Sequence, residues 1–198
     1  MSKILFLPGA GGAPEFWQPV AALLPSSMPY ELVGWPGLGA QPHDPAVQGF
    51  DDLVRLVRER LSAPVDLVAQ SMGGVVAARL ALEVPDKVRR LVLAVTSGGV
   101  DMAGLGASDW REDYRRSNPQ AAAWVTEQRV SPDLPVERIA APTLLLWGDD
   151  DPISPVAVGR HLQARLPSAG LHVVRGGRHD LVRTHAGEVA PLIVRHLA

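Results

Sequence analysis

Cysteine is absent from all 198 residues of the chain. Its absence excludes a disulfide framework, a thiol nucleophile and a zinc site with cysteine ligands. Long apolar runs are missing too, because Pro8 and Gly9 interrupt the run at residues 4–7 and no later run is long enough to span a membrane. We therefore expect no signal peptide, no transmembrane helix and no membrane partner, and the chain is predicted to be cytoplasmic.

An excess of positive charge is also missing. The formal net charge is −2, and the arginine pairs at positions 89–90 and 115–116 are isolated. Binding to nucleic acid needs a clustered basic face, so nucleic acid is not an expected partner. Hydrophobic residues make up 46% and charged residues 20%, which is typical of a globular protein. The length suits one domain spanning residues 1–198.

Short apolar runs alternate with amphipathic stretches along most of the chain. The runs are rich in Val and Leu on both faces, as in strands that helices cover from two sides. Strands are expected at residues 3–7, 30–34, 65–69, 88–95, 143–147 and 171–175. Helices are expected at residues 16–24, 51–61, 72–83, 155–166 and 187–197. This alternation predicts an α/β fold with about six parallel strands and helices on both faces.

Residues 97–141 interrupt the alternation. They contain several glycines, three large aromatic residues and a proline-rich end, but no clear strand pattern. We interpret them as a small cap insertion, with helices around residues 109–116 and 120–129. Trp110 and Tyr114 share a helix face at i, i+4 spacing, which suits packing onto the body or contact with substrate. Trp110, Tyr114 and Trp124 are therefore candidate pocket residues.

The stretch VAQSMGGVV, residues 68–76, leads from an apolar run through a serine into small residues. Ser71 could be the N-cap of a helix. With Ala69 in place of the first glycine, the stretch also resembles the G-x-S-x-G turn that presents a nucleophilic serine between a strand and a helix. Ligands of parallel sheets bind beyond the carboxyl ends of the strands, so residues at the other strand ends help to decide.

Carboxylates and an imidazole follow two later strands. Asp149, Asp150 and Asp151 follow the fifth expected strand, and His179 follows the sixth. An imidazole can take the proton of an attacking serine and return it, and a carboxylate fixes its tautomer. The order Ser, Asp, His is that of α/β-hydrolase triads, which favours a nucleophilic Ser71. The aspartate run lacks the pattern of a calcium loop and no H-E-x-x-H spacing occurs, so no metal is expected.

Five stretches resemble the α/β-hydrolase superfamily: LFLPGAGG, GWPGLGAQP, VAQSMGGVVAARLALEVPDKVRRLVL, APTLLLWGDDDPISP and GGRHD. The resemblance covers nearly the whole chain and implies a shortened α/β-hydrolase fold. The family's acid lies three residues after the glycine that ends its strand, here Gly148, which implies a catalytic triad of Ser71, Asp151 and His179. Asp101 is the alternative acid, since some relatives place it after the fourth strand.

The resemblance also implies an oxyanion hole formed by the N–H groups of Ala10 and Met72. The expected activity is that of a serine hydrolase that cleaves carboxylic esters, or thioesters, of small or short acyl groups through an acyl-enzyme, without a cofactor. Pro8 stands where most relatives have histidine, as in type II thioesterases, so an enzyme for carrier-bound acyl groups is an alternative. A lyase that uses the triad as a base and a hydrolase-like binding protein are further alternatives. The sequence leaves the oligomeric state open.

Overall fold

A single parallel sheet forms the centre of the protein in the computed structural model, which describes residues 2–127 and 133–198. Within these residues, six strands lie in the order β2-β1-β3-β4-β5-β6, and each neighbouring pair is parallel. The strands are β1 (Lys3–Leu7), β2 (Tyr30–Leu32), β3 (Val65–Gln70), β4 (Val88–Ala94), β5 (Thr143–Gly148) and β6 (Ala169–Val174). The prediction of about six parallel strands is confirmed.

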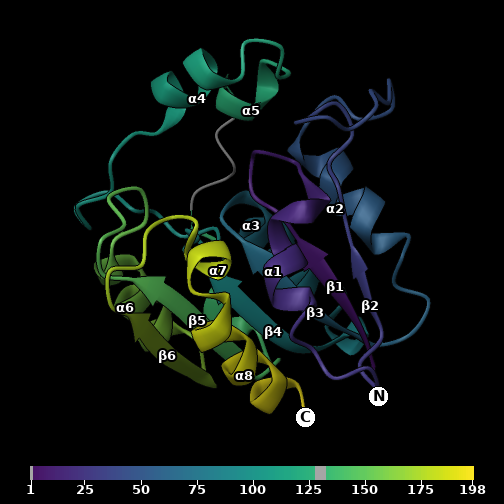
Figure 1. Ribbon diagram of the computed structural model, residues 1–198, viewed down its shortest axis with the longest axis vertical. Coiled ribbons are helices and arrows are strands. Elements are labelled where there is room, and N and C mark those ends of the chain that lie inside the picture. Colours follow the sequence, from purple (N-terminus) through teal and green to yellow (C-terminus); the bar gives the residue numbers. More distant parts are fainter. Residues whose placement is uncertain (1, 128–132) are drawn as a thin grey trace.

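Helices cover both faces of this sheet (Figure 1). One face carries α1 (Gln18–Ala21), α7 (Leu181–Thr184) and α8 (Ala186–Leu197), which pack on one another. The other carries α3 (Met72–Glu83), with α2 (Phe50–Arg58) against it, and α6 (Val156–Arg165). Short 3-10 helices lie at η1 (Pro14–Trp17), η2 (Pro85–Lys87) and η3 (Val136–Arg138). The longest of these described helices has 12 residues, and none has the length and apolar character needed to cross a bilayer.

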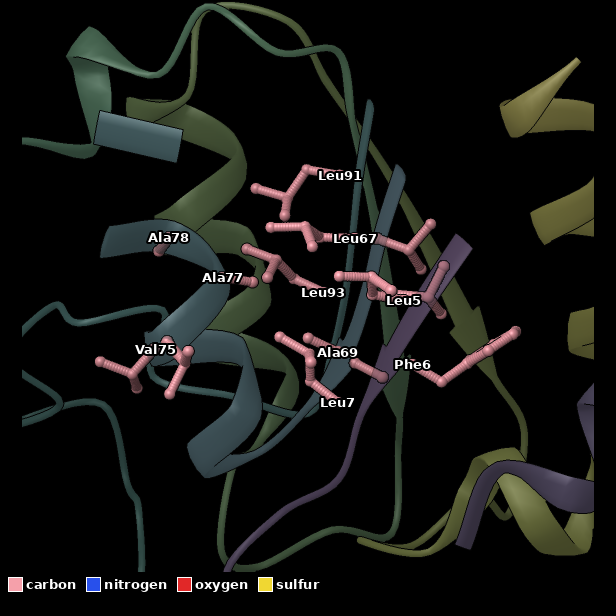
Figure 2. Packing of buried hydrophobic residues seen from close by; sticks show 14 of the residues in the cluster. Leu5, Phe6, Leu7, Leu67, Ala69, Val75, Ala77, Ala78, Leu91 and Leu93 are labelled. Atoms are coloured by element: carbon pink, nitrogen blue, oxygen red, sulfur yellow. The ribbon is translucent and has the colours of Figure 1, made fainter. Parts of the chain in front are cut away.

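Buried leucines fill the space between the sheet and α3. Leu5, Leu67 and Leu91 are register partners on β1, β3 and β4, and all three are fully buried. Figure 2 shows their side chains on the side of the sheet where α3 presents Ala77. Phe6 points to the opposite side, because successive residues of a strand face opposite ways. Both faces of the strands are therefore apolar, which explains their continuous Val and Leu pattern.

The strand order changes direction between β1 and β3. From β1 the chain goes to β2 on one side, and β3 then lies on the other side of β1. The loops that follow β1 and β3 therefore diverge, and such a point in a parallel sheet is where ligands bind. The residues after these two strands are the glycine-rich loop at 8–12 and Ser71.

Helix ends differ from the prediction mainly where proline occurs. One helix was expected at residues 16–24, but the structure has η1 followed by the four-residue α1, with a proline in the first turn of each. Proline lacks an N–H group and suits the first turn of a helix, so Pro14 and Pro19 each lie in the first turn of a new short helix, although α8 accommodates Pro191 in its interior. The four-residue α7, directly after the GGRHD stretch, was not predicted.

The helices of the segment 97–141 that follow β4, at residues 111–117 and 124–127, lie beyond the carboxyl ends of the strands (Figure 1). The segment contains α4 (Arg111–Ser117), α5 (Trp124–Glu127) and η3. Ser108 N–H donates to the Pro152 carbonyl at 2.8 Å, which attaches the segment to the loop after β5, and within the segment Leu134 N–H donates to the Gly99 carbonyl at 2.8 Å. The helix expected at residues 120–129 corresponds to α5, and its last two residues lie outside the described residues.

Candidate active site

Ser71 lies at a sharp turn between β3 and α3. Its backbone has φ 52° and ψ −121°, a conformation that side-chain-bearing residues rarely adopt. Gly73 permits the turn, because a Cβ atom there would lie only 2.5 Å from the Pro8 carbonyl oxygen. The Thr96 hydroxyl donates to the Ser71 carbonyl at 2.6 Å and so holds the turn from the end of β4. Strain of this kind persists only where its surroundings enforce it, and it concentrates at functional sites.

His179 connects the serine to a buried carboxylate. Its Nε2 lies 3.0 Å from Ser71 Oγ, and its Nδ1 lies 2.8 Å from Asp151 Oδ2. The side chain of Asp151 has no exposed surface, and its Oδ1 accepts a hydrogen bond from Ile153 N–H at 2.9 Å. A carboxylate only accepts hydrogen bonds, so Nδ1 carries the proton and Nε2 accepts from the serine hydroxyl. These three side chains, which the sequence placed after three different strands, form one hydrogen-bonded chain.

The other candidate aspartates do not contact the imidazole of His179 and have different partners. Asp149 Oδ1 accepts a hydrogen bond from Gly176 N–H at 2.6 Å, and exposed Asp150 lies 3.7 Å from Arg178. Asp101 Oδ1 accepts from Ala103 N–H at 2.9 Å. In the described part of the chain, no group of three His, Asp or Glu side chains is arranged as metal ligands.

The loop after β1 faces the serine turn, and each successive carbonyl group there accepts a hydrogen bond. The indole N–H groups of Trp17 and Trp35 donate to the carbonyls of residues 7 and 8 at 3.0 and 2.9 Å. The Gly9 carbonyl accepts from Gly12 N–H at 3.1 Å, which turns the Ala10 amide of the same planar peptide the opposite way. Met72 is the first residue of α3, where amide groups have no partner within the helix.

A cavity of about 830 Å³ opens above Ser71 and His179. Its volume lies within the usual range for small-molecule sites, about 300–1,000 Å³. The apolar part of its lining includes Val95, Val100, Met102, Trp110, Trp124 and Ile153. The rim carries charges of both signs, and the N–H and guanidinium groups of Arg111 lower the pKa of Asp109 there, so it stays a carboxylate.

Two of the three candidate pocket aromatics, Trp110 and Trp124, line this cavity. Tyr114 lines a second, neighbouring hollow of about 360 Å³, and its hydroxyl donates to the Ala10 carbonyl at 2.8 Å. The ring of Tyr114 meets that of Trp110 edge to face, with centroids 5.5 Å apart. Tyr114 therefore connects the cavity wall to the loop after β1, a contact that helix periodicity does not reveal.

Sequence reasoning missed one residue that lies behind these groups. Gln70, the last residue of β3, is 4% exposed, and its side-chain amide donates to the backbone carbonyl of His179 at 3.1 Å. The signal available in the sequence was a polar side chain between the apolar run at residues 65–69 and Ser71. Buried polar groups are nearly always hydrogen-bonded, but the sequence does not reveal the partner.

Residues 4–192 match the model of the alpha/beta hydrolase family. The pimeloyl-[acyl-carrier protein] methyl ester esterase of Neisseria meningitidis serogroup B is 26% identical over 240 residues, covering 97% of this chain and 91% of the esterase. The poly(3-hydroxyalkanoate) depolymerase of Ectopseudomonas oleovorans is 24% identical over 240 residues, covering 100% of this chain and 84% of the depolymerase. Both alignments exceed 198 residues, so these relatives carry residues that this chain lacks.

Solved structures share the same architecture. A thermophilic esterase from Thermogutta terrifontis superimposes with a TM-score of 0.78 at 20% identity, covering 100% of this chain and 89% of the esterase. At this identity the likeness shows the fold alone.

Proposed function

The chain belongs to the alpha/beta hydrolase family, and we propose that it is a serine hydrolase that cleaves carboxylic esters of short acyl groups. The observation that carries this proposal is the chain of hydrogen bonds from Ser71 Oγ through His179 to Asp151, at 3.0 and 2.8 Å. Ser71 and His179 line a cavity that is large enough for a small ester. The esterase and depolymerase names of the relatives support the same activity.

The first half of the reaction forms an acyl-enzyme. Ser71 Oγ attacks the carbonyl carbon of the ester while His179 Nε2 takes the hydroxyl proton. The buried carboxylate of Asp151 stabilises the resulting imidazolium through its hydrogen bond to Nδ1. The C–O bond to the leaving group then breaks, and His179 returns the proton to the departing alkoxide. The products of this half are the alcohol and an ester between the acyl group and Ser71.

The second half hydrolyses this ester with water. His179 Nε2 takes one proton from the water as its oxygen attacks the acyl carbon, and then returns a proton to Ser71 Oγ as the carboxylic acid leaves. Both halves pass through a tetrahedral oxyanion, which the amides of Ala10 and Met72 would bind. Donors that already point at this oxygen lower the barrier by about 2.7–4 kcal/mol each. The reaction needs these side chains and water, and no cofactor.

We further propose that the segment 97–141 is a cap that shapes the acyl site. It contributes Trp110 and Trp124 to the cavity wall, and its helices α4 and α5 have only seven and four residues. An apolar wall favours each added methylene group of the acyl chain by about 0.8 kcal/mol until the available space is filled. Catalytic efficiency is therefore expected to rise over the first few carbons and then to fall.

A carrier-bound ester is the second candidate substrate. It is favoured by the name of one relative, which acts on the methyl ester of a pimeloyl group on an acyl-carrier protein. In that case the body of the carrier would supply much of the binding energy, and free esters would be poor substrates at every chain length.

The test is a panel of p-nitrophenyl esters from acetate to laurate, with matched acyl thioesters and methyl esters of carrier-bound acyl groups. We expect kcat/KM to be highest for a short free ester, and Ser71→Ala to abolish turnover. Efficient cleavage of the carrier-bound esters alone would favour the second candidate. Binding of esters without turnover would favour a hydrolase-like binding protein and contradict the proposal.

A further inference from the structure

Four successive carbonyl groups, from the last residue of β1 onward, each accept a hydrogen bond, and the last donor comes from a distant segment. Trp17, Trp35 and the Gly12 amide hold the carbonyls of residues 7, 8 and 9. These three donors lie in the body of the protein near the loop. The fourth carbonyl, that of Ala10, accepts from the hydroxyl of Tyr114, which is 104 residues further along the chain and lies on α4.

The Ala10 carbonyl directly precedes a glycine in the loop. It belongs to the planar peptide between Ala10 and Gly11. Gly11 has no atom within 4 Å of the position that a Cβ would occupy, so the loop is open on this side. Glycine itself also permits a wide range of backbone angles. The Tyr114 hydroxyl is thus the contact that fixes the second peptide plane of the loop, as Gly12 fixes the first.

Tyr114 is itself held firmly. Its N–H group donates to the Trp110 carbonyl at 3.0 Å, and its carbonyl accepts from the backbone and side-chain N–H groups of Asn118 at 2.8 and 3.1 Å. The neighbouring Arg115 donates through Nε to the Thr126 hydroxyl at 3.0 Å, which joins α4 to α5. Burial raises the pKa of Tyr114, so its phenol keeps the proton that it donates across the neutral range.

We propose that Tyr114 is a positioning residue for the Ala10 amide. Gly12 holds the peptide plane that carries this amide, Tyr114 holds the plane that follows it, and together they fix the backbone of Ala10 in the orientation needed to bind the oxyanion. The inference rests on the proposed function, because it assigns to the Ala10 amide the role of an oxyanion donor. It differs from the expected role of Tyr114 as a wall of the substrate pocket. Through the edge-to-face contact with Trp110, it also makes the loop geometry depend on the placement of α4 over the cavity.

The test removes the hydroxyl alone, in Tyr114→Phe. We expect kcat per active site to fall about tenfold, the effect of losing one hydrogen bond, while KM changes by less than about twofold. The affinity for an alkyl boronic acid, which forms a tetrahedral adduct with the catalytic serine, should weaken by the same factor as kcat. Titration of active sites with a fluorophosphonate normalises kcat for any unfolded protein.

The chain offers a matched control, because it has only one other tyrosine. Tyr30 is in β2, 41% exposed and on the far side of β1 from β3. Tyr30→Phe should leave kcat, KM and boronic acid affinity unchanged.

Two outcomes overturn the inference. One is an unchanged kcat and boronic acid affinity in Tyr114→Phe. The other is a rise in KM at constant kcat, which would place Tyr114 against the substrate instead. Failure of the proposed function gives a different result, since the wild-type protein would then neither cleave esters nor bind the boronic acid at Ser71.

Discussion

The side-chain amide of Gln70 donates a hydrogen bond of 3.1 Å to the backbone carbonyl of His179, 109 residues further along the chain. Gln70 directly precedes Ser71, so one buried side chain connects the strand that carries the nucleophile to the loop that carries the base. Gly9 lies against the same side chain, because a Cβ there would be 2.4 Å from Gln70 Oε1. The loop after β1, the serine turn and the loop that carries His179 therefore meet at Gln70.

Replacing Gln70 with Leu keeps the volume of the side chain but removes this hydrogen bond. We expect kcat to fall about tenfold with little change in KM, because His179 would lose one of the contacts that aim its ring. Steady-state kinetics on the best ester of the panel measures the effect. Gln48→Leu is the control, since Gln48 makes the same type of bond to the Pro45 carbonyl at 3.1 Å in an exposed loop. Equal effects in the two variants would contradict the positioning role.

The three adjacent aspartates are expected to differ sharply in their effect on activity. Asp151→Asn should lower kcat by about 10³–10⁴-fold, because an amide at this position favours the wrong tautomer of His179. Asp149→Asn and Asp150→Asn should stay within about tenfold of the wild type, since neither carboxylate contacts the imidazole. If Asp149→Asn is the most damaging of the three, the assignment of the acid is wrong.

Thr96 is expected to matter for stability. Its hydroxyl donates to the Ser71 carbonyl at 2.6 Å and accepts from Gly98 N–H at 3.0 Å, and the residue is 1% exposed. Thr96→Val keeps the shape but leaves both groups with one partner fewer, so the free energy of unfolding should fall by about 1–3 kcal/mol. Urea denaturation measures this, with Thr184→Val as the control, since Thr184 is exposed at the end of α7. A drop of the same size in both variants would argue against a specific role.

His196 is expected to make stability depend on pH. Burial lowers its pKa below the usual value of about 6.5, and Nε2 lies 3.1 and 3.2 Å from the carbonyl oxygens of Leu91 and Pro142. As the pH falls below about 6.5, the unfolded chain binds a proton that the folded chain excludes, so stability present above that pH is lost.

In His196→Gln the free energy of unfolding should therefore decline less between pH 7 and pH 5 than in the wild type. The other five histidines are common to both proteins, so the difference between the two declines reports on His196 alone. Urea denaturation at the two pH values provides the measurement. Parallel declines would show that His196 does not contribute.

Local sequence patterns predicted the strands of the sheet well, but they predicted the helix ends and the contacts between distant loops poorly. The strands followed from continuous Val and Leu runs, because burial on both faces leaves that pattern in the sequence. The helix expected at 16–24 was too long, since Pro19 starts a second helical turn there. The hydrogen bond from Tyr114 to Ala10 could not be predicted, because the two residues are far apart in the sequence and come together only in the folded chain.

The candidate site shows the same division. Strand ends and residue order led to Ser71, the three aspartates and His179, since parallel strands bring their carboxyl ends to one edge. The resemblance to α/β-hydrolases then singled out Asp151. Their catalytic roles, and that of the oxyanion amides, stay predictions. Gln70 was overlooked because its hydrogen-bond partner is a backbone carbonyl. Every residue has such a carbonyl, so the sequence does not show which one is the partner.

Covalent labelling with a fluorophosphonate tests the central claim most directly, because the reagent reacts only with a serine that its surroundings have activated. The wild-type protein should gain one adduct, located on Ser71 by mass spectrometry of its peptides, and should lose all esterase activity in parallel. Ser71→Ala should neither be labelled nor turn over esters, while its thermal unfolding shows an intact fold. An adduct on another serine, or an active Ser71→Ala protein, would contradict the account.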